Sequence, residues 1–405
     1  MTQPPAPSPG PPGAAPPSLN TLRLAFLAML GGVGAFGPFL GLSLSRAGYS
    51  GAEVGLLLGV IPLANMVATP LWAMAADRSS AATRILQLAA AASAAIVAAI
   101  AIGGLPFAAL VGVLALYGLM RAPVGPVLDA LTVRALELGS GDPRGYGRIR
   151  LWGSVGFLAA GATASVVADH FAAPGAPLWV AVGCWSLGTL VLLRMPATRA
   201  SGPVALGASL RALGGQPGLR WLVLALPLHG LGLNAYDAWY AIHIDALALD
   251  SAWTGAAMLV GIGAEIGLMA LSARVLGRRD PLLLLMFAMG LAAVRWAIVG
   301  LVDAPLLLTA AQLSHGVVYG LFWMAATEAM RRWAAPQVRA SGQALLLVAC
   351  YGLGPVLTST VGALIVPKMG TGALFLAASL ASLGATALVG LAWRASGAPR
   401  PSAEG

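Results

Sequence analysis

The sequence predicts an all-α integral membrane protein in which twelve transmembrane helices form two six-helix bundles with pseudo-two-fold symmetry. Its composition, a series of long apolar runs and an internal repeat support this prediction. Of the 405 residues, 59% are hydrophobic and 9% are charged, whereas soluble globular domains carry about 25% charged residues. A chain with so few charged side chains has too little polar surface for a soluble protein, so we expect it to lie in a lipid bilayer.

The apolar runs have the length that a membrane span requires. A helix needs about 20 apolar residues to cross a hydrocarbon core of about 30 Å. Glycine, proline and charged residues divide the sequence into runs of that length. The predicted spans lie near 21–45, 52–76, 83–102, 106–135, 150–168, 177–195, 219–246, 252–276, 281–301, 305–332, 341–366 and 371–394.

The longest polar connection falls in the middle of the chain and separates two halves of nearly equal length. We therefore expect an N-terminal bundle over 19–195, a central cytoplasmic loop over 196–218, a C-terminal bundle over 219–396 and a cytoplasmic tail over 397–405. Residues 1–18 are rich in proline and have no basic residue before an apolar segment. A signal peptide needs that basic start, so we expect a disordered cytoplasmic tail instead.

The two halves repeat each other's features. Each carries basic residues after its second span, at Arg78 and Arg84 in the first half and at Arg274, Arg278 and Arg279 in the second. Each fifth span is rich in small residues, as in GSVGFLAAGATAS and YGLGPVLTSTVGA, which let helices approach closely. Parallel repeats of six helices are typical of secondary transporters.

The distribution of basic residues predicts the orientation. With the N-terminus in the cytoplasm, only Arg46 and Lys368 of the 23 lysines and arginines fall on the outer side, and Arg121 and Arg295 fall within spans. Basic residues are enriched in cytoplasmic loops, so we expect both termini to be cytoplasmic. The abundance of alanine, glycine and arginine indicates a GC-rich bacterial gene, and we expect a multi-pass protein of the bacterial inner (plasma) membrane.

Several function classes are disfavoured. The net charge of +9 comes from short clusters between spans rather than from one basic face, so we expect no nucleic-acid partner. The sequence has no GxxxxGK[ST] loop, and its four histidines have no HExxH spacing, so we expect neither ATP drive, nor a metal, nor another cofactor, nor an enzyme. We expect a monomer whose partners are a small-molecule substrate, protons and the bilayer, with the proton gradient as energy source.

Five segments carry a resemblance to a known family: the hairpin over 36–78, PVGPVLDAL (123–131), YGRIRLWGSVGF (146–157), GAEIGLM (263–269) and LSHGVVYG (313–320). Over about 20–395 the chain resembles the major facilitator superfamily, and within it the phenylpropionate permeases, the lactose permease and the nucleoside:proton symporters. The resemblance implies two six-helix bundles, alternating access and a cytoplasmic gate at Asp77 and Arg78. Ala73 and Ser80 replace glycines of the usual gate motif.

The resemblance also implies site residues. Asp129 and Arg150 stand where the lactose permease has a carboxylate and an arginine that hold the sugar. Glu265, Arg295 and His315 resemble its glutamate in span eight, arginine in span nine and histidine in span ten, which implies a role in proton coupling. The carboxylate that follows this histidine by one turn in those symporters is absent, because Val318 occupies its place.

The charged side chains within the predicted spans point to the same site residues on physical grounds. A charge at mid-bilayer costs at least about 2.5 kcal/mol, so such residues tend to be paired and to mark ion or substrate paths. We expect Glu265 to bind and release a proton as alternating access moves Arg295 toward this carboxylate and away from it. A static Glu265–Arg295 bridge that only fixes helix packing is the alternative. His315 is either a proton relay or a neutral imidazole that donates to a carbonyl or serine.

The substrate site has further candidates. Arg121 would hold an anionic carboxylate, or pair with a carboxylate on another span. Asp237 lies among aromatic residues that form either a cavity wall or an interfacial belt. Trp152 would stack on a substrate ring or face lipid, and Asp129 and Arg150 would also form an inner gate.

These residues together predict proton symport of an aromatic or other organic acid, similar to phenylpropionate. The alternatives are a sugar or nucleoside proton symporter, a drug-type exporter, and a scaffold that has lost coupling.

Overall fold

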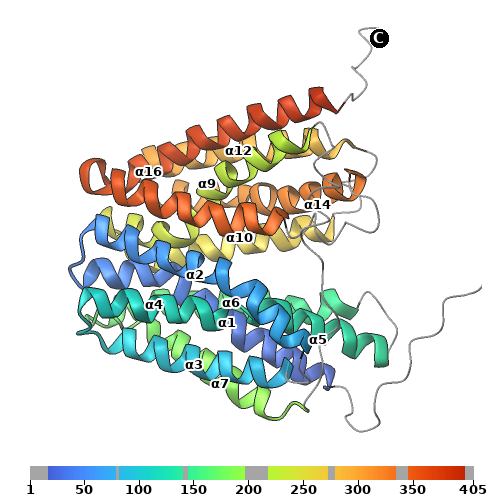
Figure 1. Ribbon diagram of the computed structural model, residues 1–405. Helices are drawn as coiled ribbons and strands as arrows, with labels where there is room; N and C mark the ends of the chain where they lie inside the picture. The colour runs from blue at the N-terminus through green and yellow to red at the C-terminus, as the bar shows by residue number, and fades with distance from the viewer. Residues whose placement is uncertain are drawn as a thin grey trace, which may run out of the picture.

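The computed structural model describes residues 17–78, 82–139, 145–196, 218–271, 279–333 and 345–396, and every regular element in these ranges is a helix. The first half forms one bundle, which lies in the lower part of Figure 1. Its helices are α1 (Leu19–Arg46), α2 (Gly51–Arg78), α3 (Ala82–Ile102), α4 (Phe107–Arg121), α5 (Val124–Gly139), α6 (Gly145–His170) and α7 (Leu178–Leu193).

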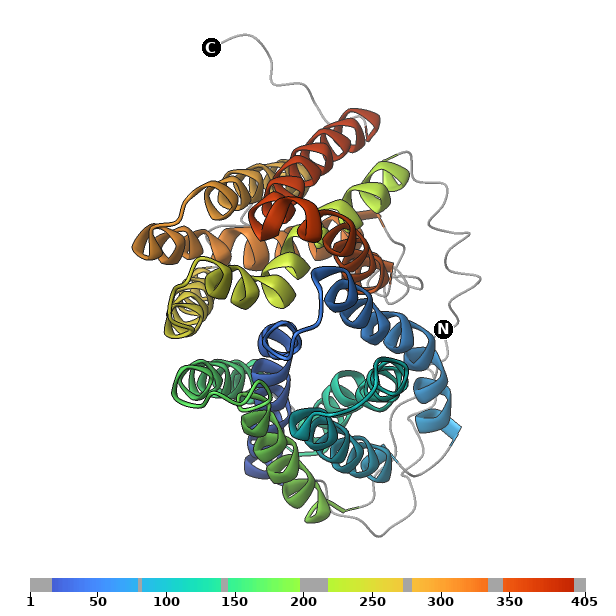
Figure 2. The same ribbon diagram turned by 90° about the vertical axis from the view of Figure 1, so that its left-hand side faces the viewer.

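The second half forms the other bundle, which lies beside the first when the molecule is viewed along its helices (Figure 2). Its long helices are α9 (Leu219–Ala246), α10 (Ala252–Ala270), α12 (Pro281–Leu301), α14 (Phe322–Trp333) and α16 (Gly354–Ala395). The short elements are the helix α13 (Pro305–Ala311), the 3-10 turn η1 (Gln312–Ser314) and two π-helical turns, η2 (Gly316–Leu321) and η4 (Val348–Leu353).

The described helices are consistent with the twelve predicted spans. Among the described residues, nine helical stretches are long and apolar enough to cross a membrane, α7 is a shorter apolar helix, and α9 is a 28-residue helix at the predicted seventh span. One span consists of α4 and α5, another of α13 to α14. The final stretch contains two spans, because Gly370 interrupts α16 with a φ of 78°. That left-handed backbone conformation is accessible to glycine at little cost.

Local sequence signals account for where several helices begin. The Ser18 side chain accepts a hydrogen bond from the Thr21 backbone N–H at the start of α1, and Ser50 and Glu53 form a reciprocal capping box at the start of α2. At α12, Asp280 caps the Leu282 N–H, and Pro281 follows at the first helical position. Asp280 also accepts a bond from the Trp393 indole at 3.0 Å, which ties the start of α12 to the end of α16.

Among the described residues, the main contacts between the bundles join α1 with α9, α2 with α16, and α6 with α10, and the turn η4 also contacts α2. The approach of α2 to α16 depends on Gly55, where an added Cβ would lie 2.6 Å from Ala363 Cβ. This contact lies toward the end of the molecule where α1 ends and α2 begins, which the distribution of basic residues predicts to be the outer face.

Candidate substrate and proton site

Arg295 is the buried centre of the polar cluster in the second bundle. It lies on α12 and is 1% exposed. Its Nε donates to Gln312 Oε1 at 3.1 Å, its Nη2 donates to the same oxygen, and its guanidinium lies 4.7 Å from the centre of the Tyr236 ring. The Gln312 amide in turn donates to the Leu308 carbonyl at 2.8 Å. A neutral amide therefore holds this arginine in place, and no carboxylate among the described residues pairs with it directly.

His315 lies between Arg295 and Glu265. Its Nδ1 is 3.2 Å from Arg295 Nη1, and its Nε2 is 3.5 Å from Glu265 Oε2. Because guanidinium nitrogens can only donate, Nδ1 must accept, and a neutral His315 carries its proton on Nε2, facing the Glu265 carboxylate. The direct Glu265–Arg295 bridge expected from the sequence is not among the ion pairs of the described residues. The imidazole separates the two groups instead.

Close packing of α10 against the π-helical turn η2 places Glu265 beside His315. An added Cβ at Gly316 would lie 2.7 Å from the Ala264 carbonyl oxygen, so any larger residue would push the two segments apart. The second buried histidine nearby, His229, contacts the Val318 carbonyl through Nε2 at 3.1 Å. Its role is therefore consistent with helix packing.

Asp237 on α9 adds a second carboxylate to the cluster. It is exposed, although the preceding Tyr236 is buried. It makes no hydrogen bond with another described residue, yet it lies close enough to Arg295 and Glu265 for their charges to act on it. Its carboxylate is therefore available to a ligand.

Three aromatic side chains extend the cluster across spans ten and eleven. Tyr319 stacks on His315 at 5.2 Å and its hydroxyl hydrogen-bonds that of Tyr351, which stacks on Trp323 at 5.3 Å. We call Tyr319, Tyr351 and Trp323 the aromatic wall. Tyr319 and Tyr351 lie on the π-helical turns η2 and η4, and such turns often occur at functional sites.

Sequence reasoning missed the aromatic wall and Gln312. A usable signal was present, because Tyr319 and Trp323 follow His315 by four and eight residues and so share its helix face.

Asp129 and Arg150 lie close together but do not pair directly. The Tyr146 hydroxyl donates to Asp129 Oδ1 at 2.9 Å, and Arg150 lies near both groups. Asp129 is on α5 and Arg150 on α6, both in the first bundle. A bond between these two residues would therefore not join the two bundles, and the inner gate expected from them stays a prediction.

Arg150 and Trp152 face different surroundings. The Arg150 guanidinium lies 5.5 Å from the centre of the Phe26 ring on α1 and is close enough to Tyr319 of the opposite bundle for its charge to act there. Trp152 is 42% exposed. Residues two apart lie about 200° apart around a helix, so Trp152 points away from the side that Arg150 shares with the aromatic wall. This position favours the lipid-facing alternative.

Arg121 ends α4, where the chain turns at Ala122 and Pro123 before α5. Its helical position lies between Tyr117, which packs on α1, and Gly118, which packs on α2. It is half-buried and makes no hydrogen bond or ion pair with another described residue. Its guanidinium is therefore free to bind a ligand.

Asp77 and Arg78, the expected cytoplasmic gate, end α2, but their side chains lie outside the described part of the structure. The described residues contain no group of three or more histidine, cysteine, aspartate or glutamate side chains that could hold a metal ion.

Residues 19–377 match the MFS_1 like family, which is most of the chain. The chain belongs to this family. It is a multi-pass membrane transporter of the major facilitator type, as the resemblance of its segments indicated, and its relatives are transporters rather than enzymes.

Two relatives show how this family member compares in sequence. A maltose permease of Geobacillus stearothermophilus is 28% identical over 354 residues, which cover 86% of this chain and 88% of the permease. The uncharacterized transporter YwbF of Bacillus subtilis (strain 168) is 22% identical and covers 80% of this chain and 80% of its own length.

Solved structures confirm the fold. The nucleoside transporter NupG matches with a TM-score of 0.80 at 16% identity, over 92% of this chain and 98% of NupG. A variant of the peptide transporter POT matches with a TM-score of 0.73 at 15% identity, over 93% of this chain and 94% of the other. At these identities the likeness supports the architecture alone.

Proposed function

We propose that this transporter is a proton symporter for a small organic solute, and that the solute is a neutral sugar. The observation that carries the proton coupling is the series Arg295–His315–Glu265 with Asp237 nearby. Together these side chains offer two carboxylates and one guanidinium. With His315 neutral, one bound proton balances their charge, and uncompensated charge within a membrane is costly.

The same groups suit coupling by alternating access. A proton bound at Glu265 lies next to the Nε2–H of His315, and His315 contacts Arg295 through Nδ1. A shift of α10 relative to α12 would change the contacts on both sides of the imidazole at once. Glu265 would then hold its proton in one state and release it in the other, with the solute carried in the same cycle.

The free polar groups favour a neutral sugar. Asp237 has no hydrogen-bond partner among the described residues, so its carboxylate can accept bonds from sugar hydroxyls. The aromatic wall provides hydroxyl groups and ring faces, which suit the apolar face of a pyranose. Arg295, by contrast, is 1% exposed and already bonded to Gln312 and His315, so little of its guanidinium is accessible to an anion. The similarity to a maltose permease supports this class.

An aromatic or other organic acid is the second candidate, and Arg121 favours it. This half-buried guanidinium has no ion-pair partner among the described residues, and a substrate carboxylate would form charge-assisted hydrogen bonds with it. Arg150 adds a second cation near the interface, but Asp129 compensates part of its charge.

Uptake by proteoliposomes with an inward proton gradient tests the proposal. We expect labelled maltose or a related sugar to accumulate above equilibrium and to leave when a protonophore removes the gradient. Accumulation of phenylpropionate without sugar uptake would instead identify an organic acid symporter. Sugar that only equilibrates would contradict proton coupling, and binding without flux would indicate a scaffold.

A further inference from the structure

Four side chains at the predicted outer face form a polar contact between the bundles that involves none of the residues of the candidate substrate and proton site. They are Arg46 at the end of α1, Asp169 near the end of α6, Asp245 near the end of α9 and Ser251, which precedes α10. Arg46 and Asp169 belong to the first bundle, whereas Asp245 and Ser251 belong to the second. We call this group the outer latch.

Arg46 reaches across the interface to two partners, Asp245 and Ser251. Its Nη2 lies 2.6 Å from Asp245 Oδ1 and 3.2 Å from Ser251 Oγ, and its Nε donates to the same aspartate at 3.0 Å. Its Nη1 donates to the Ala168 carbonyl of its own bundle at 2.7 Å. The guanidinium therefore binds α6 of its own bundle and, across the interface, α9 and the residue that precedes α10.

Asp169 makes the complementary contact in the same direction. Its two carboxylate oxygens accept from the backbone N–H groups of Ser251 and Ala252, each at 2.8 Å. These N–H groups begin α10, where the helix dipole favours a negative charge. The first bundle thus supplies both a cation that pairs with Asp245 and an anion that binds the N-terminus of α10.

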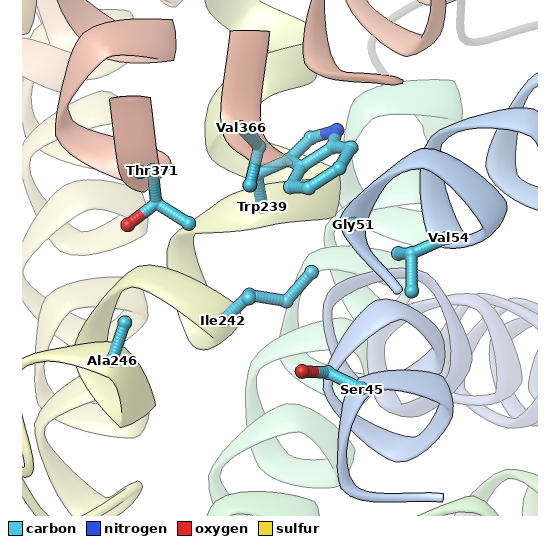
Figure 3. Close-up of a pocket in the computed structure, with 9 residues that line it drawn as sticks. Ser45, Gly51, Val54, Trp239, Ile242, Ala246, Val366 and Thr371 are labelled. Atoms are coloured by element: carbon cyan, nitrogen blue, oxygen red, sulfur yellow. The ribbon is translucent and has the colours of Figure 1, made fainter. Parts of the chain in front are cut away.

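Apolar packing beside the latch is incomplete. A cavity of about 220 Å³ lies between the bundles here, lined by Ser45 and Val54 of the first bundle and by Ile242, Val366 and Thr371 of the second, among others (Figure 3). Ser45 and Ala246, which also lines the cavity, adjoin Arg46 and Asp245 in sequence. Because side chains do not fill this space, the polar bonds of the outer latch contribute more than apolar packing to holding the two bundles together at this end.

We propose that the outer latch is the extracellular gate, and that it sets how often the transporter opens outward. A major facilitator protein must separate its bundles at the outer face in each cycle, and every bond between the bundles at this end must then break. The helices that the latch holds carry Asp237 on α9 and Glu265 on α10. Release of the latch therefore frees both carboxylate-bearing helices from the first bundle. The proposal depends on the transport cycle of the family and on the predicted orientation, and not on proton coupling or on a sugar substrate.

Thiol labelling in membrane vesicles tests the gate. Val54 is 1% exposed in this closed arrangement, so Val54→Cys should react slowly with a membrane-impermeant maleimide added from the outer side. We expect Arg46→Gln or Asp245→Asn in that background to speed labelling by about threefold to tenfold, as loss of a charge-assisted bond that stabilises only the closed state would do. The reversed pair Arg46→Asp with Asp245→Arg should return the rate part of the way.

Lys368→Gln is the matched control, because it removes an exposed positive charge near the same end and Lys368 forms no ion pair among the described residues. Its labelling rate should stay at the Val54→Cys level. Asp169→Asn, which weakens the contact with α10, should speed labelling independently. Equal labelling rates in all variants would overturn the gate. So would a reversed pair whose labelling rate does not recover although its thermal stability matches that of Val54→Cys. Neither result would bear on proton symport.

Discussion

His315 Nδ1 lies 3.2 Å from Arg295 Nη1, and His315 Nε2 lies 3.5 Å from Glu265 Oε2, so a single imidazole ring connects the buried cation to the carboxylate. A direct salt bridge would fix both charges in place. An intervening histidine can change its donor and acceptor roles as either neighbour moves. We therefore expect the effect of each of the three residues on transport to depend on the other two.

Glu265→Gln should abolish accumulation of solute against its gradient while leaving exchange of labelled for unlabelled solute intact. Glutamine keeps the size of the side chain and can still receive the His315 Nε2–H, but it cannot bind and release a proton. Proton-driven uptake and counterflow in the same proteoliposomes separate the two activities. Asp303→Asn, which removes an exposed carboxylate between α12 and α13, should change neither. Unaltered accumulation in Glu265→Gln would show that the proton travels elsewhere.

Most of the fold could be predicted from the sequence, because span length and charge position follow from the thickness and polarity of the bilayer. The predicted span near 281–301 coincides with α12, and that near 219–246 coincides with α9. The breaks inside spans were not predicted. Two π-helical turns interrupt spans ten and eleven, and these depend on packing that apolar periodicity does not encode.

Gln312→Ala should destabilise the protein more than loss of an ordinary hydrogen bond. It leaves the buried Arg295 Nε and Nη2 without their acceptor, and an unsatisfied buried donor costs about 1–3 kcal/mol, more when it is charged. Thermal unfolding of the purified protein in detergent measures the change as a lower Tm. Gln87→Ala, which removes a half-buried amide bonded to the Leu192 carbonyl, should lower the Tm less. An equal effect of both variants would mean that Arg295 finds another acceptor.

The site was predicted less completely than the fold. The charged residues stood out because ionisable groups are rare in apolar spans, and Glu265, Arg295 and His315 do meet in space. Their order could not be predicted, since it depends on the rotation of α12 relative to η2. Gln312, Tyr319 and Tyr351 were missed because neutral polar and aromatic residues are common in membrane helices. The contact of the Tyr146 hydroxyl with Asp129 was not predicted either, because no sequence pattern indicated it.

Tyr351→Phe and Tyr319→Phe should each raise the KM for a sugar with little effect on expression. Each change keeps the stacked ring and removes one of the two hydroxyl groups that bond each other. A neutral hydrogen bond contributes about 0.5–1.5 kcal/mol, which corresponds to a rise in KM of about twofold to tenfold. Initial rates of uptake over a range of solute concentrations give the value. Tyr49→Phe, whose hydroxyl bonds the Leu105 carbonyl far from the site, should leave KM unchanged, and a similar rise there would exclude a specific role for the pair.

Arg121→Gln distinguishes the two substrate classes. If the solute is a neutral sugar, the change should alter its KM by no more than a few-fold, because a glutamine amide can still donate hydrogen bonds in the same place. If the solute is a carboxylate, loss of the charge-assisted bonds, worth about 1.5–3 kcal/mol each, should reduce uptake at least tenfold. Arg121→Lys would then restore part of the uptake, since it keeps the charge but not the planar fork.

Arg84→Gln, on the exposed first turn of α3, removes the same type of charge outside the interface and should affect neither solute. A large loss of sugar uptake in Arg121→Gln, with normal folding and no rescue by lysine, would mean that this arginine binds the sugar directly and would remove the argument for an anionic substrate.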